Sequence, residues 1–156
     1  MKLLKLITLV VLFTFFSFVL AEQELTLNQA LSIIKAAQEK AVEIETPINV
    51  AVVDEGGNLL AFARMDDAIL VSIEIAIDKA WTALAVKLPT AELAEVAAPG
   101  GAVFGAHTTN NGRVMIFGGG IPIQVDNRVI GGIGVSGGSV EQDILVAEAG
   151  LAALNN

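Results

Sequence analysis

Few side chains in this 156-residue chain are suited to catalysis, and this narrows the reactions it can perform. The chain has one histidine, His107, and no cysteine or tyrosine. Without cysteine there can be no thiol nucleophile, cysteine-bound zinc or iron–sulfur cluster. A serine hydrolase has little support, because there is no serine-elbow motif and the single histidine would have to lie beside both an acid and Ser136 or Ser139. The acidic residues show no EF-hand or zinc-site spacing.

Arg64 is the side chain best suited to hold an anion. A guanidinium at the end of a strand can bind a carboxylate through two parallel hydrogen bonds. The alternative is structural, namely an internal salt bridge from Arg64 to Asp66, Asp54 or Asp143. Asp66 is otherwise expected to orient the turn or cap the following helix. Lys79 is expected to pair with Glu74, Asp78 or an acidic ligand.

Glycines are concentrated between Phe117 and Gly138. The segment Gly132–Gly137 fits the G-x-G-x-x-G pattern of dinucleotide-binding folds, which also needs a further strand and a distant acidic residue. The segment after Gly137 is typical of one helix and of no further strand, so we do not expect that site. A P-loop is not expected either, because no Gly-Lys-Ser/Thr follows the glycines. We expect the glycines to permit close packing and positive φ where strand meets helix. The amides at the start of the last helix remain available to an anion.

Helical spacing and turn residues predict how these residues are positioned. The predicted order is helix, two strands, helices, three strands, helix. Hairpin connections favour a mainly antiparallel, five-stranded sheet in α/β/α layers. Capping boxes are expected at Thr26 and Ser139, and Thr90 is expected to cap a shorter helix. The predicted strands are 48–54, 59–64, 114–117, 121–125 and 128–135, and residues 99–113 form a long polar loop.

Residues 1–21 resemble a secretory signal peptide, with Lys2 and Lys5 before an apolar run and cleavage expected after Ala21. The run is short for a membrane span, so no stable membrane insertion is expected after cleavage. Residues 22–156 would then form one domain in the periplasm or outside the cell. The formal charge of −8 disfavours nucleic acid and anionic membranes as partners.

Seven short motifs occur in an order that resembles the GlcG/HbpS-like family, which includes the C-terminal domain of PduO-type proteins. The resemblance covers nearly all of residues 25–154. It rests on the segments 53–59, 64–66, 79–83, 117–123, 131–138, 141–143 and 147–151.

The resemblance implies a profilin-like fold, a tendency to form homo-oligomers, and haem as a ligand of some members. Haem iron takes an axial His, Met, Cys or Tyr, so His107 is the candidate metal ligand. Met65 and Met115 are expected in the core. Thr108 and Thr109 are candidates for a weak oxygen ligand or a propionate contact.

The leading hypothesis is an exported, oligomeric protein that binds haem for capture, storage or sensing, with a possible sensor or transport partner. The pocket would combine the 99–113 loop, the turn at Arg64 and Asp66, and the backbone of Gly118, Gly119 and Gly120. One alternative is an enzyme or accessory factor for a small carboxylate or hydroxy acid, with Arg64 as anchor and His107 as acid/base. A structural assembly module without a ligand is the third reading.

Overall fold

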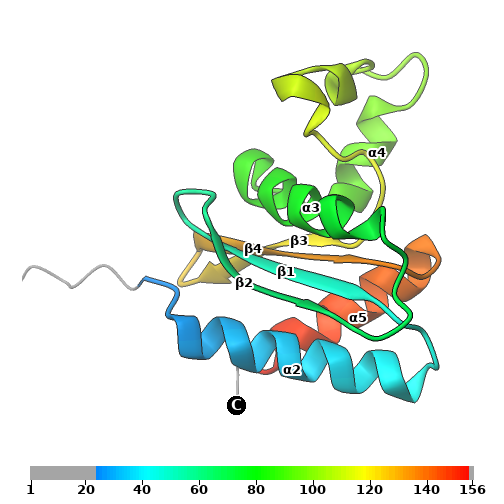
Figure 1. Cartoon of the computed structure of the whole chain (residues 1–156). Helices are drawn as coiled ribbons and strands as arrows, with labels where there is room; N and C mark the ends of the chain where they lie inside the picture. Colours follow the sequence, from blue (N-terminus) through cyan, green and yellow to red (C-terminus); the bar gives the residue numbers. More distant parts are fainter. Residues whose placement is uncertain (1–23, 155–156) are drawn as a thin grey trace, which may run out of the picture.

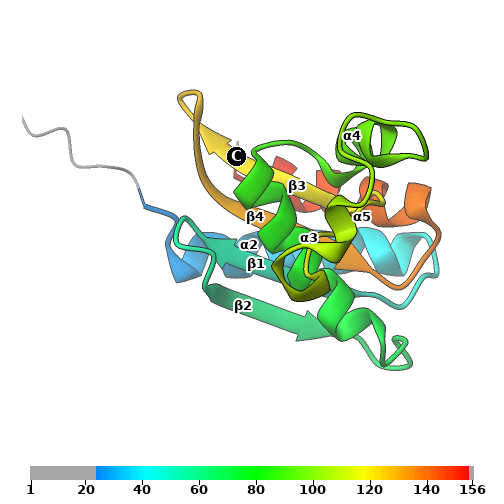
Figure 2. The ribbon, with the colours of Figure 1, turned by 90° about the horizontal axis from the view of Figure 1, so that it is seen from above.

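The computed structural model describes residues 24–154 and has a four-stranded antiparallel sheet between two layers of helices (Figure 1). The helices α2 (Leu27–Glu43) and α5 (Val140–Ala152) lie on one face, and α3 (Ser72–Val86) lies on the other, with α4 (Thr90–Ala97) to the side of α3 (Figure 2). The strand order is β2-β1-β4-β3. The strands are β1 (Asn49–Asp54), β2 (Leu59–Arg64), β3 (Gly120–Val125) and β4 (Arg128–Ser136).

The mixed α/β class, the antiparallel pairing and the helical layers are confirmed, but the predicted fifth strand at 114–117 is wrong. This segment is bound to a helix instead. The hydroxyl of Thr82 on α3 donates to the carbonyl of Arg113 at 3.2 Å and accepts from the amide of Met115 at 3.0 Å. These bonds replace strand pairing for the segment that leads into β3.

The central strand β1 is buried on both faces, as its uninterrupted apolar sequence predicts. Val50 and Val52 belong to the core against α2 and α5. Ala51 and Val53 face the other way, into a smaller core with Ala76 and Ala80 of α3. The alternation of side chains along β1 therefore supplies both helical layers.

Glycines let α3 lie directly on the sheet. A Cβ at Gly132 would overlap the carbonyl of Ala80, and one at Gly134 would overlap the carbonyl of Ala76. Much of the glycine-rich region is thus a docking surface for a helix backbone, which agrees with its predicted role in close packing.

Two predicted helix starts are confirmed, and a third is wrong. Thr26 begins α2 and Ser139 begins α5, each with a reciprocal capping box. Thr90 is the first residue of α4 and Pro89 takes the cap position. The buried Thr90 hydroxyl accepts from the amide of Gly120 at 2.9 Å, so it joins α4 to the outer edge of β3.

No helix among residues 24–154 is long and apolar enough to cross a membrane. The signal peptide predicted for residues 1–21 lies outside the described residues.

Candidate functional site

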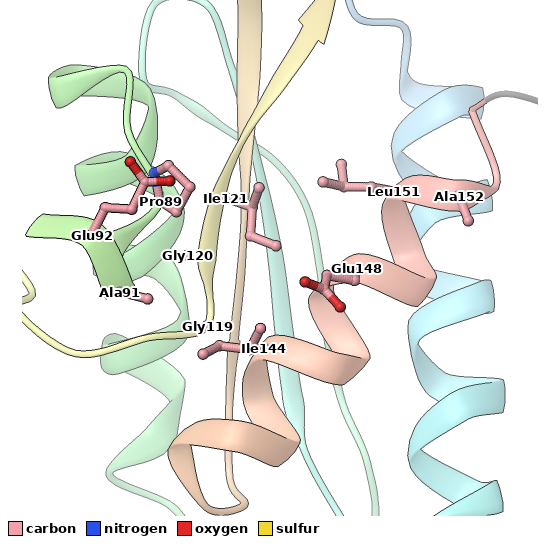
Figure 3. Close-up of a pocket in the computed structure, with 10 residues that line it drawn as sticks. All are labelled: Pro89, Ala91, Glu92, Gly119, Gly120, Ile121, Ile144, Glu148, Leu151 and Ala152. Carbon is pink, nitrogen blue, oxygen red and sulfur yellow. The ribbon is translucent and has the colours of Figure 1, made fainter.

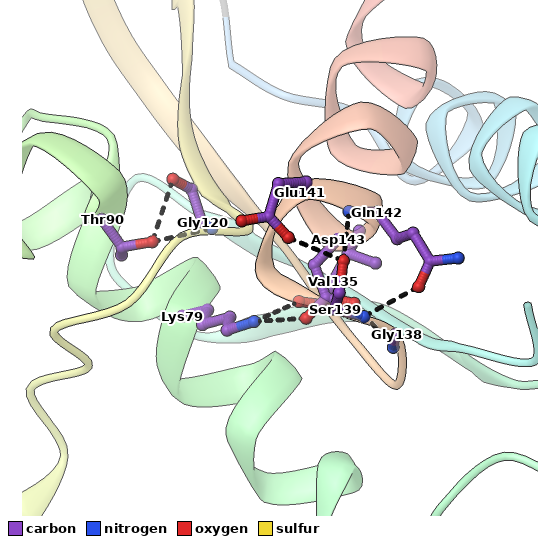
Figure 4. Close-up of polar contacts among 9 residues, drawn as sticks. All are labelled: Lys79, Thr90, Gly120, Val135, Gly138, Ser139, Glu141, Gln142 and Asp143. Carbon is purple, nitrogen blue, oxygen red and sulfur yellow. Dashed lines mark hydrogen bonds and ion pairs between the residues drawn. The ribbon is translucent and has the colours of Figure 1, made fainter.

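A buried ion pair lies where the two helical layers meet beside the glycine-rich strands (Figure 4). The Nζ of Lys79 on α3 is 2.7 Å from Oδ2 of Asp143 on α5, and the two side chains are 0% and 5% exposed. The same Nζ donates to the carbonyl of Val135 at 2.8 Å and lies 4.8 Å from the centre of the Phe117 ring. The expected pairing of Lys79 with Glu74 or Asp78 is therefore wrong.

Burial disfavours the charge of both partners. Desolvation lowers the pKa of Lys79 and raises the pKa of Asp143, against the mutual attraction of the two charges. Asp143 also accepts from the backbone amide of Gly138 at 3.0 Å, which favours its ionised form. The pair is thus held by several polar contacts in a dry part of the molecule.

Gly119 separates this pair from the surface. Its φ is +111°, and a Cβ there would lie 2.8 Å from both Lys79 Nζ and Asp143 Cβ. Only glycine fits this conformation and this space. The carbonyl of Gly119 accepts from the amide of Val135 at 2.9 Å, so β3 begins directly over the ammonium.

A pocket of about 550 Å³ opens on the other side of Gly119 and Gly120 (Figure 3). Its walls come from the start of α4 and from α5, with β3 between them. Most of the lining is apolar, and Glu92 and Glu148 add two exposed carboxylates. The lining side chains also include Pro89, Ile121, Ile144 and Leu151.

His107 lies in the segment that projects beyond α3, on the side away from the sheet (Figure 1). The segment contains two short 3₁₀ turns, η2 (Ala106–Thr108) and η3 (Asn110–Gly112). His107 is exposed, and so are two apolar neighbours, Val103 at 42% and Phe104 at 61%. The predicted irregular segment is thus confirmed, with an imidazole and apolar side chains open to a ligand.

Thr108 and Thr109 are exposed but already hydrogen-bonded. Their hydroxyls donate to the carbonyls of Gly105 and Ala106, at 2.8 and 2.7 Å. The Thr109 hydroxyl also accepts from the side chain of Asn110. These bonds fix the local turn and leave the Thr108 oxygen as the freer acceptor.

Arg64 is exposed at the end of β2, and its guanidinium is bound to the backbone. Its Nε and Nη2 donate to the carbonyl of Ala68, at 3.2 and 2.9 Å. The expected internal salt bridge is therefore wrong. Asp54 binds its own turn through the Gly56 amide, and Asp66 is exposed.

The candidate residues occupy three places. Gly119 and Gly120 line the pocket beside α5, with Gly118 buried next to them. His107, Thr108 and Thr109 lie on the projecting segment, whereas Arg64 ends β2 and Asp66 follows it. In Figure 1, α3 lies between the projecting segment and the sheet that contains β2. The structure does not gather the three groups into one pocket.

Sequence reasoning missed the pairing of Lys79 with Asp143. A signal was present, because Lys79 lies between Ala76 and Ala83 on the buried face of α3. A lysine on such a face requires a buried partner. Among residues 24–154, no group of three or more His, Asp or Glu side chains is placed to hold a metal ion.

Known proteins resemble the chain over nearly its whole described length. It is 45% identical over 127 residues to an uncharacterised 15.0 kDa protein from the dhaT–dhaS intergenic region of Citrobacter freundii, covering 81% of this chain and 89% of that one. It is 46% identical to the corrinoid adenosyltransferase PduO of Salmonella typhimurium over 121 residues, covering 78% of this chain but 36% of PduO.

Solved structures share the fold. A complex of PduOC with haem has 43% identity and a TM-score of 0.83, covering 85% of this chain and 96% of that one. A double mutant of HbpS from Streptomyces reticuli has 33% identity and a TM-score of 0.77, covering 86% and 90%. Residues 25–152 match the family described as "Haem degrading protein HbpS-like". The chain therefore belongs to the HbpS-like family.

Proposed function

We propose that this protein binds haem at the projecting segment 99–113, with His107 as the axial ligand of the iron. The observation that carries the proposal is the exposed His107 imidazole beside exposed Phe104 and Val103. The family description and the similarity to the haem complex of PduOC support the choice of ligand.

The side chains around His107 have the chemistry that haem requires. Imidazole is a common axial ligand, and the large apolar face of a porphyrin needs apolar side chains against it. Phe104 and Val103 supply such a surface within four residues of His107. When bound, haem would supply an iron centre, while the chain would hold it through His107 and shield one face.

A single chain offers only one side of such a site. Ligand sites usually bury most of their ligand, whereas His107 and Phe104 lie on an open surface. A second copy of this chain is the partner we propose for the other face of the haem, which makes the functional form a homo-oligomer.

Export is part of the proposal. Residues 1–21 have the pattern of a signal peptide, so the mature protein would act in the periplasm or outside the cell, in capture, storage or sensing. Cell fractionation with N-terminal sequencing tests this, and an intact Met1 in the cytoplasmic fraction would contradict it.

The carboxylate alternative has less support at Arg64. Two of its five N–H donors already bind the carbonyl of Ala68. A ligand carboxylate there would have to bind the three remaining N–H groups, two on Nη1 and one on Nη2.

Haem titration of residues 22–156 tests the proposed function. We expect a Soret shift that saturates at a fixed ratio of haem to protein and is lost in His107→Ala. Gln124→Ala is the matched control, because Gln124 is exposed on β3, outside the projecting segment. An unchanged spectrum in His107→Ala, or no shift at micromolar haem, would overturn the assignment.

A further inference from the structure

We propose a second ligand site, specific for a small organic carboxylate, between the β1–β2 turn and the end of α3. A pocket of about 540 Å³ lies there, and residues 99–113 contribute nothing to its lining. The pocket is therefore separate from the proposed haem segment, which reaches it only through the stacking of Arg113 on Trp81. Its lining includes Glu55, Gly57, Trp81, Leu84, Lys87 and Val129.

The indole of Trp81 supplies one hydrogen-bond donor. Arg113 covers a face of the ring, with its guanidinium carbon 4.5 Å from the ring centre. Gly57 faces the edge, where a Cβ would lie 2.9 Å from Cδ1 and 3.1 Å from Nε1. Without a side chain, Gly57 can pack its backbone against this edge of the indole, next to the N–H. No acceptor for that N–H is found among residues 24–154.

Lys87 supplies the charge. It is exposed and has no ion-pair partner within the described part of the chain. Its backbone is left-handed, with φ 58° and ψ 32°, at a helix end where glycine is usual. A lysine near a helix C-terminus is favourable in itself, but this one also lines the same pocket as the unpaired indole N–H.

The acidic residues near the pocket are already engaged. Glu55 pairs with Arg128, with 3.6 Å between Oε2 and Nη2. The carboxylate of Asp54 accepts from the amides of Gly56 and Asn58, both at 2.9 Å. Lys87 is therefore the cation of the lining that has no carboxylate partner among residues 24–154.

These groups define the class of ligand. A carboxylate can accept from both the indole N–H and the ammonium, which are donors only. Leu84, Ala85 and Val129 offer an apolar wall to a short hydrocarbon body. An amine of the same length would be repelled by Lys87 and would find the acceptor Glu55 already paired.

Trp81 also provides the readout. It is the only tryptophan, and the chain has no tyrosine, so intrinsic fluorescence reports on this pocket. Haem-free protein titrated with butyrate or benzoate should show a saturable change in emission. Butyramide and butylamine, which match butyrate in length, should leave the emission unchanged. Equal responses to butyrate and butyramide, or a response to butylamine alone, would overturn the proposal.

Variants separate specific binding from a nonspecific fluorescence effect. Lys87→Gln removes the charge from an exposed position and should weaken butyrate binding at least about tenfold, as expected for a charged hydrogen bond. Trp81→Phe removes the N–H, and calorimetry should show weaker binding. Lys35→Gln, on exposed α2, is the control and should bind like the unmodified protein. Unchanged affinity in Lys87→Gln, or no binding of either acid at millimolar concentration, would sink the carboxylate site.

Discussion

Lys79 and Asp143 join the two helical layers through the sheet, with 2.7 Å between Nζ and Oδ2 and almost no exposure of either side chain. Lys79 belongs to the layer of α3, and Asp143 belongs to the layer of α5. The pair meets where β3 begins, beneath Gly119 (Figure 4). One electrostatic contact thus connects both helical layers next to the pocket wall.

The first prediction concerns the loss of one partner. Asp143→Asn leaves the Lys79 ammonium buried without a counter-charge, and we expect the free energy of unfolding to fall by about 3 to 5 kcal/mol. Adding Lys79→Met should restore much of the lost free energy of unfolding, because no charge then remains buried. The amide oxygen that Asp143→Asn introduces can still accept from the N–H of Gly138. Urea unfolding measures both.

An exposed pair provides the control for that comparison. Lys35→Gln breaks the contact with Glu39 on the surface of α2 and should change stability by less than about 1 kcal/mol. If Asp143→Asn lowered the free energy of unfolding as little as Lys35→Gln does, the buried pair would contribute little to stability.

The second prediction concerns pH. A lysine whose pKa is lower in the folded chain binds fewer protons there, so stability rises with pH between the folded and unfolded pKa values. Burial lowers the pKa of Lys79 from its ordinary value of 10.5, and the charge of Asp143 opposes that shift. Asp143→Asn removes that opposing charge, so the pKa of Lys79 in the folded chain falls further. The pH range over which the stability of this variant rises then extends to lower pH. Its stability should therefore rise more steeply than that of the unmodified protein from neutral pH toward 10.5.

The double variant Lys79→Met/Asp143→Asn should not show this slope, because the titrating group is gone. The raised pKa of Asp143 acts with the opposite sign: it adds stability below the ordinary value of 3.8, and that stability is lost as pH rises through the folded pKa. Parallel curves for Asp143→Asn and the unmodified protein above neutral pH would contradict the mechanism.

Local signals in the sequence predicted much of the fold, and long-range contacts account for what it did not predict. The capping boxes at Thr26 and Ser139 involve residues three apart, so the sequence displays them directly. The segment 114–117 has a strand-like composition, but Thr82, more than thirty residues away, binds its backbone instead. Such a competition between a side chain and a strand partner leaves no local trace.

The same limit applies to the candidate site. The predicted loop around His107 is present, but composition could not show that α3 would separate it from Arg64. Lys79 and Asp143 are 64 positions apart, and only the folded chain identifies them as partners. The buried position of Lys79 on its helix could be read from periodicity, whereas the identity of its partner could not.

The third prediction separates two reasons for glycine at position 119. Gly119→Ala forces a side chain into a positive φ and against Lys79 and Asp143. Gly100→Ala is the matched control, because its φ is +84° and no atom lies within 4 Å of the added Cβ. The control should lose about 1 to 2 kcal/mol of unfolding free energy, from backbone conformation alone. Gly119→Ala should lose about 1 to 3 kcal/mol more, from overpacking. Equal losses would show that the space above the ion pair can relax.

The fourth prediction tests the apolar part of the proposed haem site. Phe104 is 61% exposed on the projecting segment, so Phe104→Ser should leave the free energy of unfolding nearly unchanged. If the ring packs on the porphyrin, its loss should weaken haem affinity at least about tenfold, the value of burying one large apolar side chain. Leu59→Ser is the control, because Leu59 is 49% exposed at the start of β2. Soret titrations compare the two, and chemical unfolding verifies that both variants stay folded. A similar loss of affinity in both, or in neither, would mean that haem does not contact the segment around His107.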